Sequence, residues 1–347
     1  MDKKQRDSVF ELARIISMIA IIASHITSHG ANGYNAPADI PVYNSVFLNI
    51  IIVGGQIGVS LFTLISAYFL STKKFHPKTL IKTIAQTFFY SSVIFFIFAI
   101  SGYTATDGEA FAKNLLPILH QRYWFVSCYV GMYLLSPLMN LLISKCSKDW
   151  HFFIIIIALF VVGQVVPFFL PPYFWKLACF LDYYAIAAYL RKRKNKITEN
   201  TIIWLALFII TYAVILSASV FYKYFMAHIN NVVGILCAVS LFCLFKNAKS
   251  RFCSKWVNLI ASTTFGIYLI HENPLIRFVL WIDLLKCNEV IYEQYFIPLA
   301  FCWVITIFVV CSIIDLIRQF AVEKPFFTAV DKIGAAIEKR KETKTQN

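Results

Sequence analysis

Arg14 and His25, both in the first apolar stretch, are the strongest candidates for chemistry. The eleven steps from one to the other, at about 100° each, end within about 20° of three full helical turns and about 16 Å along the axis. Both side chains are therefore expected on one helix face. A neutral imidazole can take a proton from an attacking hydroxyl, and a guanidinium can bind phosphate or stabilise developing negative charge. Ionisable groups in an apolar helix are costly, which favours a functional role. The alternative is a helix-capping histidine and an arginine that reaches toward the lipid headgroups.

A second group of candidates is expected near the outer ends of later helices, level with His25. It consists of Arg122, Trp124, His271 and Glu272. Asp182 lies near the middle of another apolar stretch, where a carboxylate needs a partner or water. Each of these residues taken singly is at least as compatible with a structural role. The remaining histidines, His29 among them, are interpreted as loop or interface residues, and their spacing indicates no metal site.

The composition indicates that the elements holding these residues are membrane helices. Of the 347 residues, 59% are hydrophobic and 14% are charged, whereas soluble proteins carry roughly 25% charged residues. The apolar stretches approach the roughly 20 residues that a spanning helix needs and lack the alternation of barrel strands. We therefore predict an all-α, polytopic membrane protein. The nine cysteines form no CxxC pair, so they are interpreted as packing residues and not as a disulfide framework.

Ten helices are predicted, joined by polar segments. They cover residues 8–27, 45–71, 79–101, 125–144, 152–170, 174–190, 201–219, 231–246, 256–276 and 292–317.

The basic residues predict the orientation of these helices. Most of the 32 Lys and Arg residues fall in alternate connections if both termini are cytoplasmic, including the runs at 73–82 and 191–196. Topology thus explains the net charge of +14 without a nucleic-acid partner. One transmembrane domain is expected over residues 1–325, followed by a charged cytoplasmic tail over 326–347. No nucleophile elbow, phosphate loop or dinucleotide fingerprint is present.

Four segments together resemble the integral-membrane acyltransferase 3 family over about residues 5–325. They are FELARIISMIAIIASH at 10–25, GVSLFTLISAYFL at 58–70, RYWFVSCYVGMYLLSPLMN at 122–140 and FGIYLIH at 265–271. The first contains the arginine, ten residues and histidine of the family's arrangement. Two positions differ from the usual pattern: Glu11 stands where an aspartate is usual, and Ser66-Ala67-Tyr68 stands where Ser-Gly-Phe is usual.

The resemblance implies a bacterial, multi-pass protein of the cell membrane that transfers an acyl group, usually acetyl, from cytoplasmic acyl-coenzyme A. The acceptor would be a hydroxyl of an envelope or exported saccharide, or of a glycolipid. His25 would be the catalytic base and Arg14 would handle the donor, with Ser66 and Tyr68 near the donor channel. Acyl-coenzyme A would be a substrate, and no bound cofactor or metal is expected.

The polar face of the first helix also fits a second class of protein. A transporter or flippase of a saccharide-lipid or small polar solute could use such a face. Transporters often contain inverted repeats with paired broken helices, and no clear pair is found in this sequence. A non-enzymatic subunit of an envelope-synthesis complex is a third possibility, and the oligomeric state is left open.

Overall fold

The computed structural model describes residues 6–31, 39–165, 169–222 and 228–328, and over these residues the chain is helical without strands. The helices are α1 Ser8–His25, η1 Ile26–Gly30, α2 Val42–Leu70, α3 Pro77–Ile100, α4 Gly108–Leu115, α5 Trp124–Ser144, α6 Asp149–Val165, α7 Pro172–Lys192, α8 Thr201–Tyr222, α9 Val232–Lys246, α10 Lys255–His271, α11 Pro274–Phe278, η4 Val279–Leu284, α12 Cys287–Val290, α13 Phe296–Arg318 and η5 Gln319–Glu323. The all-α prediction is confirmed for this part of the chain.

Each predicted helix has a counterpart in the structure, with two notable differences. Helix α10 ends at His271 and does not continue to 276, because Asn273 caps the next helix and Pro274 occupies its first position. The connection predicted over 102–124 contains the short helix α4, whose first turn is capped by Asp107. The end of the predicted helix 152–170 falls partly on residues 166–168, outside the described residues. Most of the predicted tail, from 329 onward, also lies outside them.

Six segments of the described chain are long and apolar enough to cross a membrane. They are Ser8–Gly30, Val42–Leu70, Pro77–Ile100, Trp124–Ser144, Thr201–Ser219 and Phe296–Thr328. Helices α6 and α9 are apolar but shorter. The structure therefore supports a helical membrane protein, while the count of ten spans and the position of the termini stay predictions.

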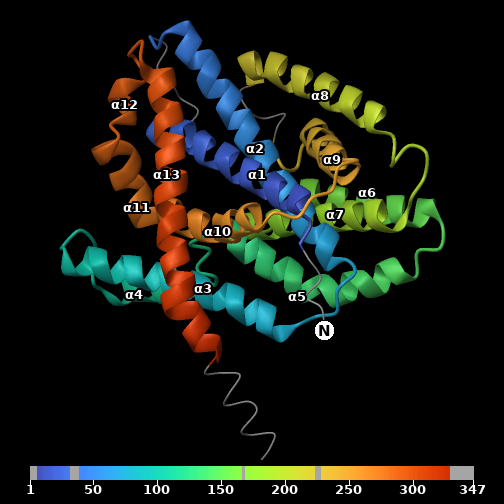
Figure 1. The fold of residues 1–347 in the computed structure, drawn as a ribbon, viewed down its shortest axis with the longest axis horizontal. Coiled ribbons are helices and arrows are strands. Elements are labelled where there is room, and N and C mark those ends of the chain that lie inside the picture. Colours follow the sequence, from blue (N-terminus) through green and yellow to red (C-terminus); the bar gives the residue numbers. More distant parts are fainter. Residues whose placement is uncertain (1–5, 32–38, 166–168, 223–227, 329–347) are drawn as a thin grey trace, which may run out of the picture.

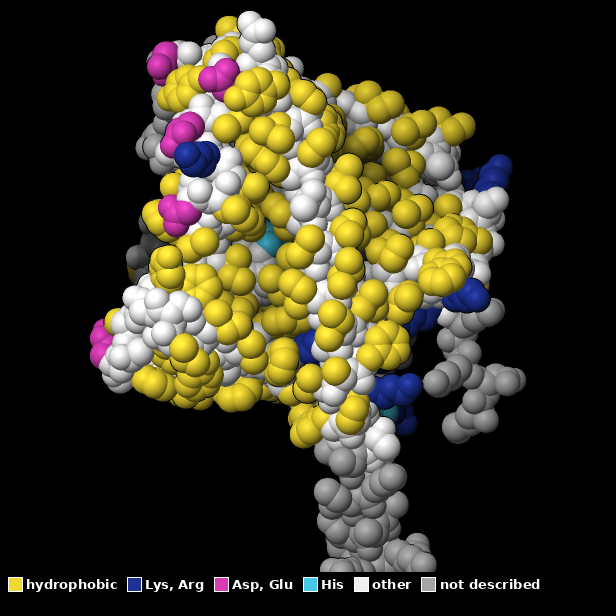
Figure 2. Space-filling view, turned by 60° about the vertical axis from the view of Figure 1, so that its left-hand side comes forward, with side chains coloured by type: hydrophobic (Ala, Val, Ile, Leu, Met, Phe, Trp, Pro, Cys, Tyr) yellow, Lys and Arg dark blue, Asp and Glu magenta, His cyan; other side chains and the backbone are white. Residues whose placement is uncertain are grey.

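The surface agrees with a bilayer environment. In Figure 2 apolar side chains cover most of the visible face, whereas most basic side chains lie along its right and lower parts and most acidic ones along its left edge. Large apolar side chains such as Ile97, Leu138 and Phe301 are more than half exposed. Exposure of this kind is unfavourable in water and favourable in lipid.

Helices α1 and α2 run through the middle of the bundle, with α10 and α13 beside them (Figure 1). Glycines set how closely α1 and α2 approach. A Cβ at Gly55 would lie 2.1 Å from Ser24 Cβ, and one at Gly58 would lie 2.9 Å from the Ser17 carbonyl oxygen. The small residues let the two backbones pack directly, as is common between membrane helices. This packing holds the helix that carries Arg14 and His25.

A buried polar cluster anchors α13 to its neighbours. The Asp315 carboxylate accepts hydrogen bonds from Tyr90 on α3 at 2.7 Å and from Arg318 Nε at 2.8 Å. Gln86 and Gln319 also donate to it, at 3.2 and 2.7 Å. Gly266 on α10 makes room, since a Cβ there would lie 2.1 Å from Asp315 Cγ.

Candidate active site around His25 and Glu272

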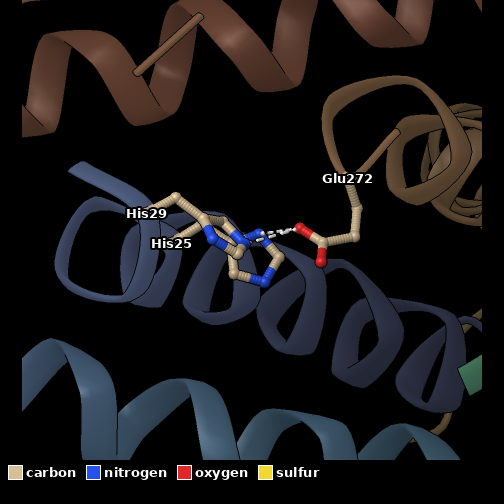
Figure 3. A group of neighbouring side chains, drawn as sticks. All are labelled: His25, His29 and Glu272. Atoms are coloured by element: carbon tan, nitrogen blue, oxygen red, sulfur yellow. Dashed lines mark hydrogen bonds and ion pairs between the residues drawn. The ribbon is translucent and has the colours of Figure 1, made fainter. Parts of the chain in front are cut away.

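Four side chains from two short segments, 25–29 and 271–272, meet at one end of α1. His25 ends α1, and His29 lies one turn later in η1. His271 ends α10, and Glu272 follows at its C-cap. The break between α10 and α11 therefore lets two consecutive residues face the same imidazole. Figure 3 shows both imidazoles of the first segment directed at the Glu272 carboxylate, where the two dashed interactions meet at one oxygen.

The distances define a connected network. Glu272 Oε2 lies 3.3 Å from His25 Nδ1 and 3.0 Å from His29 Nε2. Glu272 Oε1 accepts a hydrogen bond from Arg277 at 3.1 Å. His25 Nδ1 also lies 3.0 Å from His271 Nε2. Because its carboxylate is 92% buried, Glu272 depends on these partners to remain ionised.

The hydrogen bonds assign the proton positions in neutral imidazoles. His271 Nδ1 lies 2.6 Å from the Ile267 carbonyl oxygen, so this nitrogen carries the proton and donates it. His271 Nε2 is then an acceptor, and His25 Nδ1 must donate. His25 Nε2 consequently carries the lone pair. That atom is the one able to take a proton from a substrate.

Buried contacts hold the segment that carries His271 and Glu272. Asn273 is fully buried and donates through Nδ2 to the Tyr123 hydroxyl at 2.6 Å. The Tyr123 hydroxyl donates to the Leu269 carbonyl oxygen at 3.1 Å. These bonds connect the α10–α11 corner to the start of α5 and restrict movement of Glu272.

Three cavities that share lining residues follow one another from His25 toward the lysines between α2 and α3. A small cavity of about 40 Å³ is lined by His25, Glu272 and Trp124; we call it the histidine cavity. Next comes the basic cavity, of about 250 Å³, whose cationic lining residues are Arg6, Arg14, Lys82 and Arg318. The two share Phe62, Phe125 and Phe265 as lining residues. These three aromatic rings separate a charged space from the imidazole.

The third cavity opens near the connection between α2 and α3. This mouth cavity has a volume of about 470 Å³ and is lined by Lys73, Lys74 and His76. It shares Arg14, Ser66 and Tyr129 with the basic cavity. Arg14 is therefore placed where the two cavities meet, and its Nη1 is paired with Glu11 at 3.0 Å.

The structure brings together most of the residues predicted from sequence, and it separates others. His25, His271 and Glu272 form the network, Trp124 lines the histidine cavity, and Arg14 and Ser66 line both larger cavities. Tyr68 lines none of these three cavities. It instead contacts Arg191, whose guanidinium lies 4.3 Å from its ring centroid.

Arg122 lies just before α5, outside the network. Its Nε is buried and has no hydrogen-bond partner among the residues that the structure describes. Burial lowers the pKa of Arg122, and the nearby charge of Arg277 lowers it further. Arg122 is thus a partly buried cation, and its proposed role in binding stays a prediction.

Sequence reasoning missed His29, Arg277 and Asn273. His29 was interpreted as a loop or interface residue, and the loop alternative is wrong. The helix continues through η1 and keeps His29 beside His25, with ring centroids 4.9 Å apart. The spacing of four residues between two histidines is a signal that could have found it, since such residues share a helix face. For Arg277 and Asn273 the sequence offers no comparable signal.

His25, His29 and Glu272 could also bind a metal ion, since their ligand atoms lie within 4.8 Å of one another. Two imidazoles and a carboxylate form a donor set known for zinc. In the structure His25 Nδ1 contacts His271 Nε2, and His29 Nε2 and Glu272 Oε2 contact each other.

No curated protein and no solved structure matches the chain. A family model described as an acyltransferase domain, that of the acyltransferase 3 group, matches residues 8–317. This match covers nearly the whole chain and both halves of the histidine network, and the chain therefore belongs to the acyltransferase 3 family of membrane proteins.

Proposed function

We propose that this protein transfers an acetyl group from acetyl-coenzyme A to a hydroxyl of a saccharide or glycolipid of the cell envelope. The observation that carries this proposal is the network that leaves the lone pair of His25 on Nε2. A base of this kind is what hydroxyl acylation needs. We place the protein in a bacterial cell membrane, with both termini in the cytoplasm.

Charge supports the choice of a phosphate-bearing donor. Arg14, Lys82 and Arg318 line the basic cavity, and Lys73 and Lys74 line the mouth cavity. The acidic residue in the lining of the basic cavity is Glu323, which pairs with Lys82 and Arg318. Such a cationic surface attracts the phosphates of coenzyme A. The pantetheine arm would then extend past Phe62 and Phe125 toward His25.

The reaction follows from this arrangement. The acceptor hydroxyl attacks the thioester carbonyl carbon while its proton passes to His25 Nε2. The carbon–sulfur bond then breaks, and the coenzyme A thiolate leaves and takes up that proton. Glu272 stabilises the positive charge that His25 carries between these steps, as a carboxylate beside a catalytic imidazole does in other enzymes. His271 acts as a positioning residue, because it fixes the tautomer of His25.

The test uses membranes that contain either the wild-type protein or His25→Ala, supplied with acetyl-coenzyme A labelled on the acetyl group. Release of free thiol and transfer of label to envelope carbohydrate are both measured. We expect both signals with the wild type and neither with the variant at equal expression. Retained transfer in His25→Ala would disprove the role of His25. No transfer by folded wild type with several acyl donors, together with solute flux, would favour a transporter.

A further inference from the structure

Asp182, near the middle of α7, is buried to 97% and belongs to none of the cavities around His25. Its Oδ1 has no hydrogen-bond partner, and no ion pair or hydrogen bond of this side chain occurs within the described chain. Buried carboxylates are normally paired, because moving an unpaired carboxylate from water into the protein interior costs several kcal/mol. An unsatisfied carboxylate therefore calls for an explanation.

A large cavity provides one. Asp182 lines a cavity of about 440 Å³ between two helix pairs. Helix α6 packs against α7, and α8 packs against α9. The cavity lies where the two pairs face each other, and Figure 1 shows them together on the right of the molecule. Its size falls within the range of about 300–1,000 Å³ found for sites of small ligands.

The lining is apolar except at a few points. Phe153 and Ile157 come from α6, and Leu236 and Val239 come from α9. The polar lining residues near the connection between α7 and α8 are already engaged. Asn195 Oδ1 accepts a hydrogen bond from the backbone N–H of Thr198 at 2.8 Å. Thr198 Oγ1 accepts one from the backbone N–H of Asn195 at 2.9 Å. The Tyr189 hydroxyl and Trp204 Nε1 contact Asn195 and the Thr198 carbonyl oxygen. Asp182 Oδ1, in contrast, has no hydrogen-bond partner within the described chain.

We propose that this cavity binds a membrane-dissolved amphiphile that presents one hydrogen-bond donor, a hydroxyl or an amino group, to the Asp182 carboxylate. The apolar part of the molecule would fill the space between α6 and α9. A bilayer acyl chain alone would fill the same space and leave the carboxylate unpaired. A donor-bearing molecule satisfies both parts of the site. This proposal does not depend on acyl transfer.

The test uses the full chain in lipid nanodiscs and three photoreactive alkyl probes of one chain length. The probes end in an amino, a hydroxyl or a methoxy group. Labelled peptides are identified by mass spectrometry. We expect the donor-ended probes to label α6, α7 and α9 several-fold more than the methoxy probe. Asp182→Asn should retain the preference for the hydroxyl probe and lose most of the preference for the amine if the ligand is a cation.

Asp182→Leu should abolish the difference between the probes. Asp283→Leu, which removes an exposed carboxylate elsewhere, is the matched control and should keep the difference. If Asp182→Leu fails to fold, Val239→Phe narrows the cavity with Asp182 in place and should reduce labelling by every probe. Equal labelling of wild type by all three probes would mean that the cavity holds only apolar chains. No labelling of these helices would equally overturn the proposal.

Discussion

Glu272 and Asp315 are both buried carboxylates in ion pairs, yet their partners differ in kind. Asp315 accepts hydrogen bonds from an arginine, a tyrosine and two glutamines. None of these donors gives up its proton readily near neutral pH. Glu272 instead faces His25 and His29 as well as Arg277. Imidazoles exchange protons near neutral pH, so only the second cluster can take part in acid–base chemistry.

Position strengthens the contrast. The Asp315 carboxylate is fully buried and joins α13 to α3 and α10. Glu272 lines the histidine cavity beside His25 and Trp124. Two buried ion pairs in one membrane protein can therefore have different purposes. The Asp315 partners join three helices and hold Arg318 at the basic cavity, whereas the Glu272 partners surround His25 at the histidine cavity.

Glu272→Gln tests the chemical side of the comparison and has the largest expected effect. Activity should fall by about 10²- to 10⁴-fold, because the charge that supports protonated His25 is lost. The amide oxygen can still accept from both imidazoles, and Arg277, which loses its ion pair, is 37% exposed and can be hydrated. The thermal unfolding temperature should therefore fall less than in Asp315→Leu. The acyl-transfer rate and the unfolding temperature are measured in parallel. Unfolding as the main consequence would show that Glu272 is structural, like Asp315.

Asp315→Leu tests the structural side. Removal of one partner from a buried ion pair costs up to about 3–5 kcal/mol. Arg318 still pairs with Glu323, so the loss comes mainly from buried donors that lack an acceptor, among them the Tyr90 hydroxyl and Arg318 Nε. The free energy of unfolding in detergent measures this loss. A double variant, Asp315→Leu with Arg318→Met, should recover part of the lost stability. A stable but inactive single variant would contradict the assignment.

Arg14→Gln sharpens the comparison at the donor side. Loss of a charge-assisted contact of about 1.5–3 kcal/mol should raise the KM for acyl-coenzyme A roughly ten- to a hundredfold. The rate at saturating donor should change far less. Arg191→Gln is the control, because Arg191 contacts Tyr68 and lines none of the three cavities. An unchanged KM in Arg14→Gln would remove Arg14 from the donor path.

Tyr90→Phe has the smallest expected effect. The Asp315 carboxylate loses one of its four donors, which should cost about 1 kcal/mol of stability. Chemical unfolding of the variant measures this change, and acyl transfer should persist at near wild-type rates. A large loss of activity at unchanged stability would mean that the Asp315 cluster also serves the reaction.

Local sequence patterns predicted much of this architecture. Apolar stretches separated by polar segments are enough to predict helices, since their length and composition act locally. The helix ends were harder, as the break at Asn273 and Pro274 shows. The placement of Arg14 and His25 on one helix face was predicted from helical periodicity alone. Both residues do lie on one regular helix in the structure, and their roles stay predictions.

The sequence by itself determined a helical membrane protein of the acyltransferase 3 family and identified His25 and Arg14 as candidates. Tertiary structure alone decided which partners surround His25. The corner between α10 and α11 brings Glu272 and His271 to a residue about 246 positions earlier. The tertiary structure also decided that the Asp315 carboxylate has an ion-pair partner and that Asp182 Oδ1 has no hydrogen-bond partner within the described chain. The physical reason is that hydrogen bonds between distant segments depend on helix packing, which no local pattern encodes.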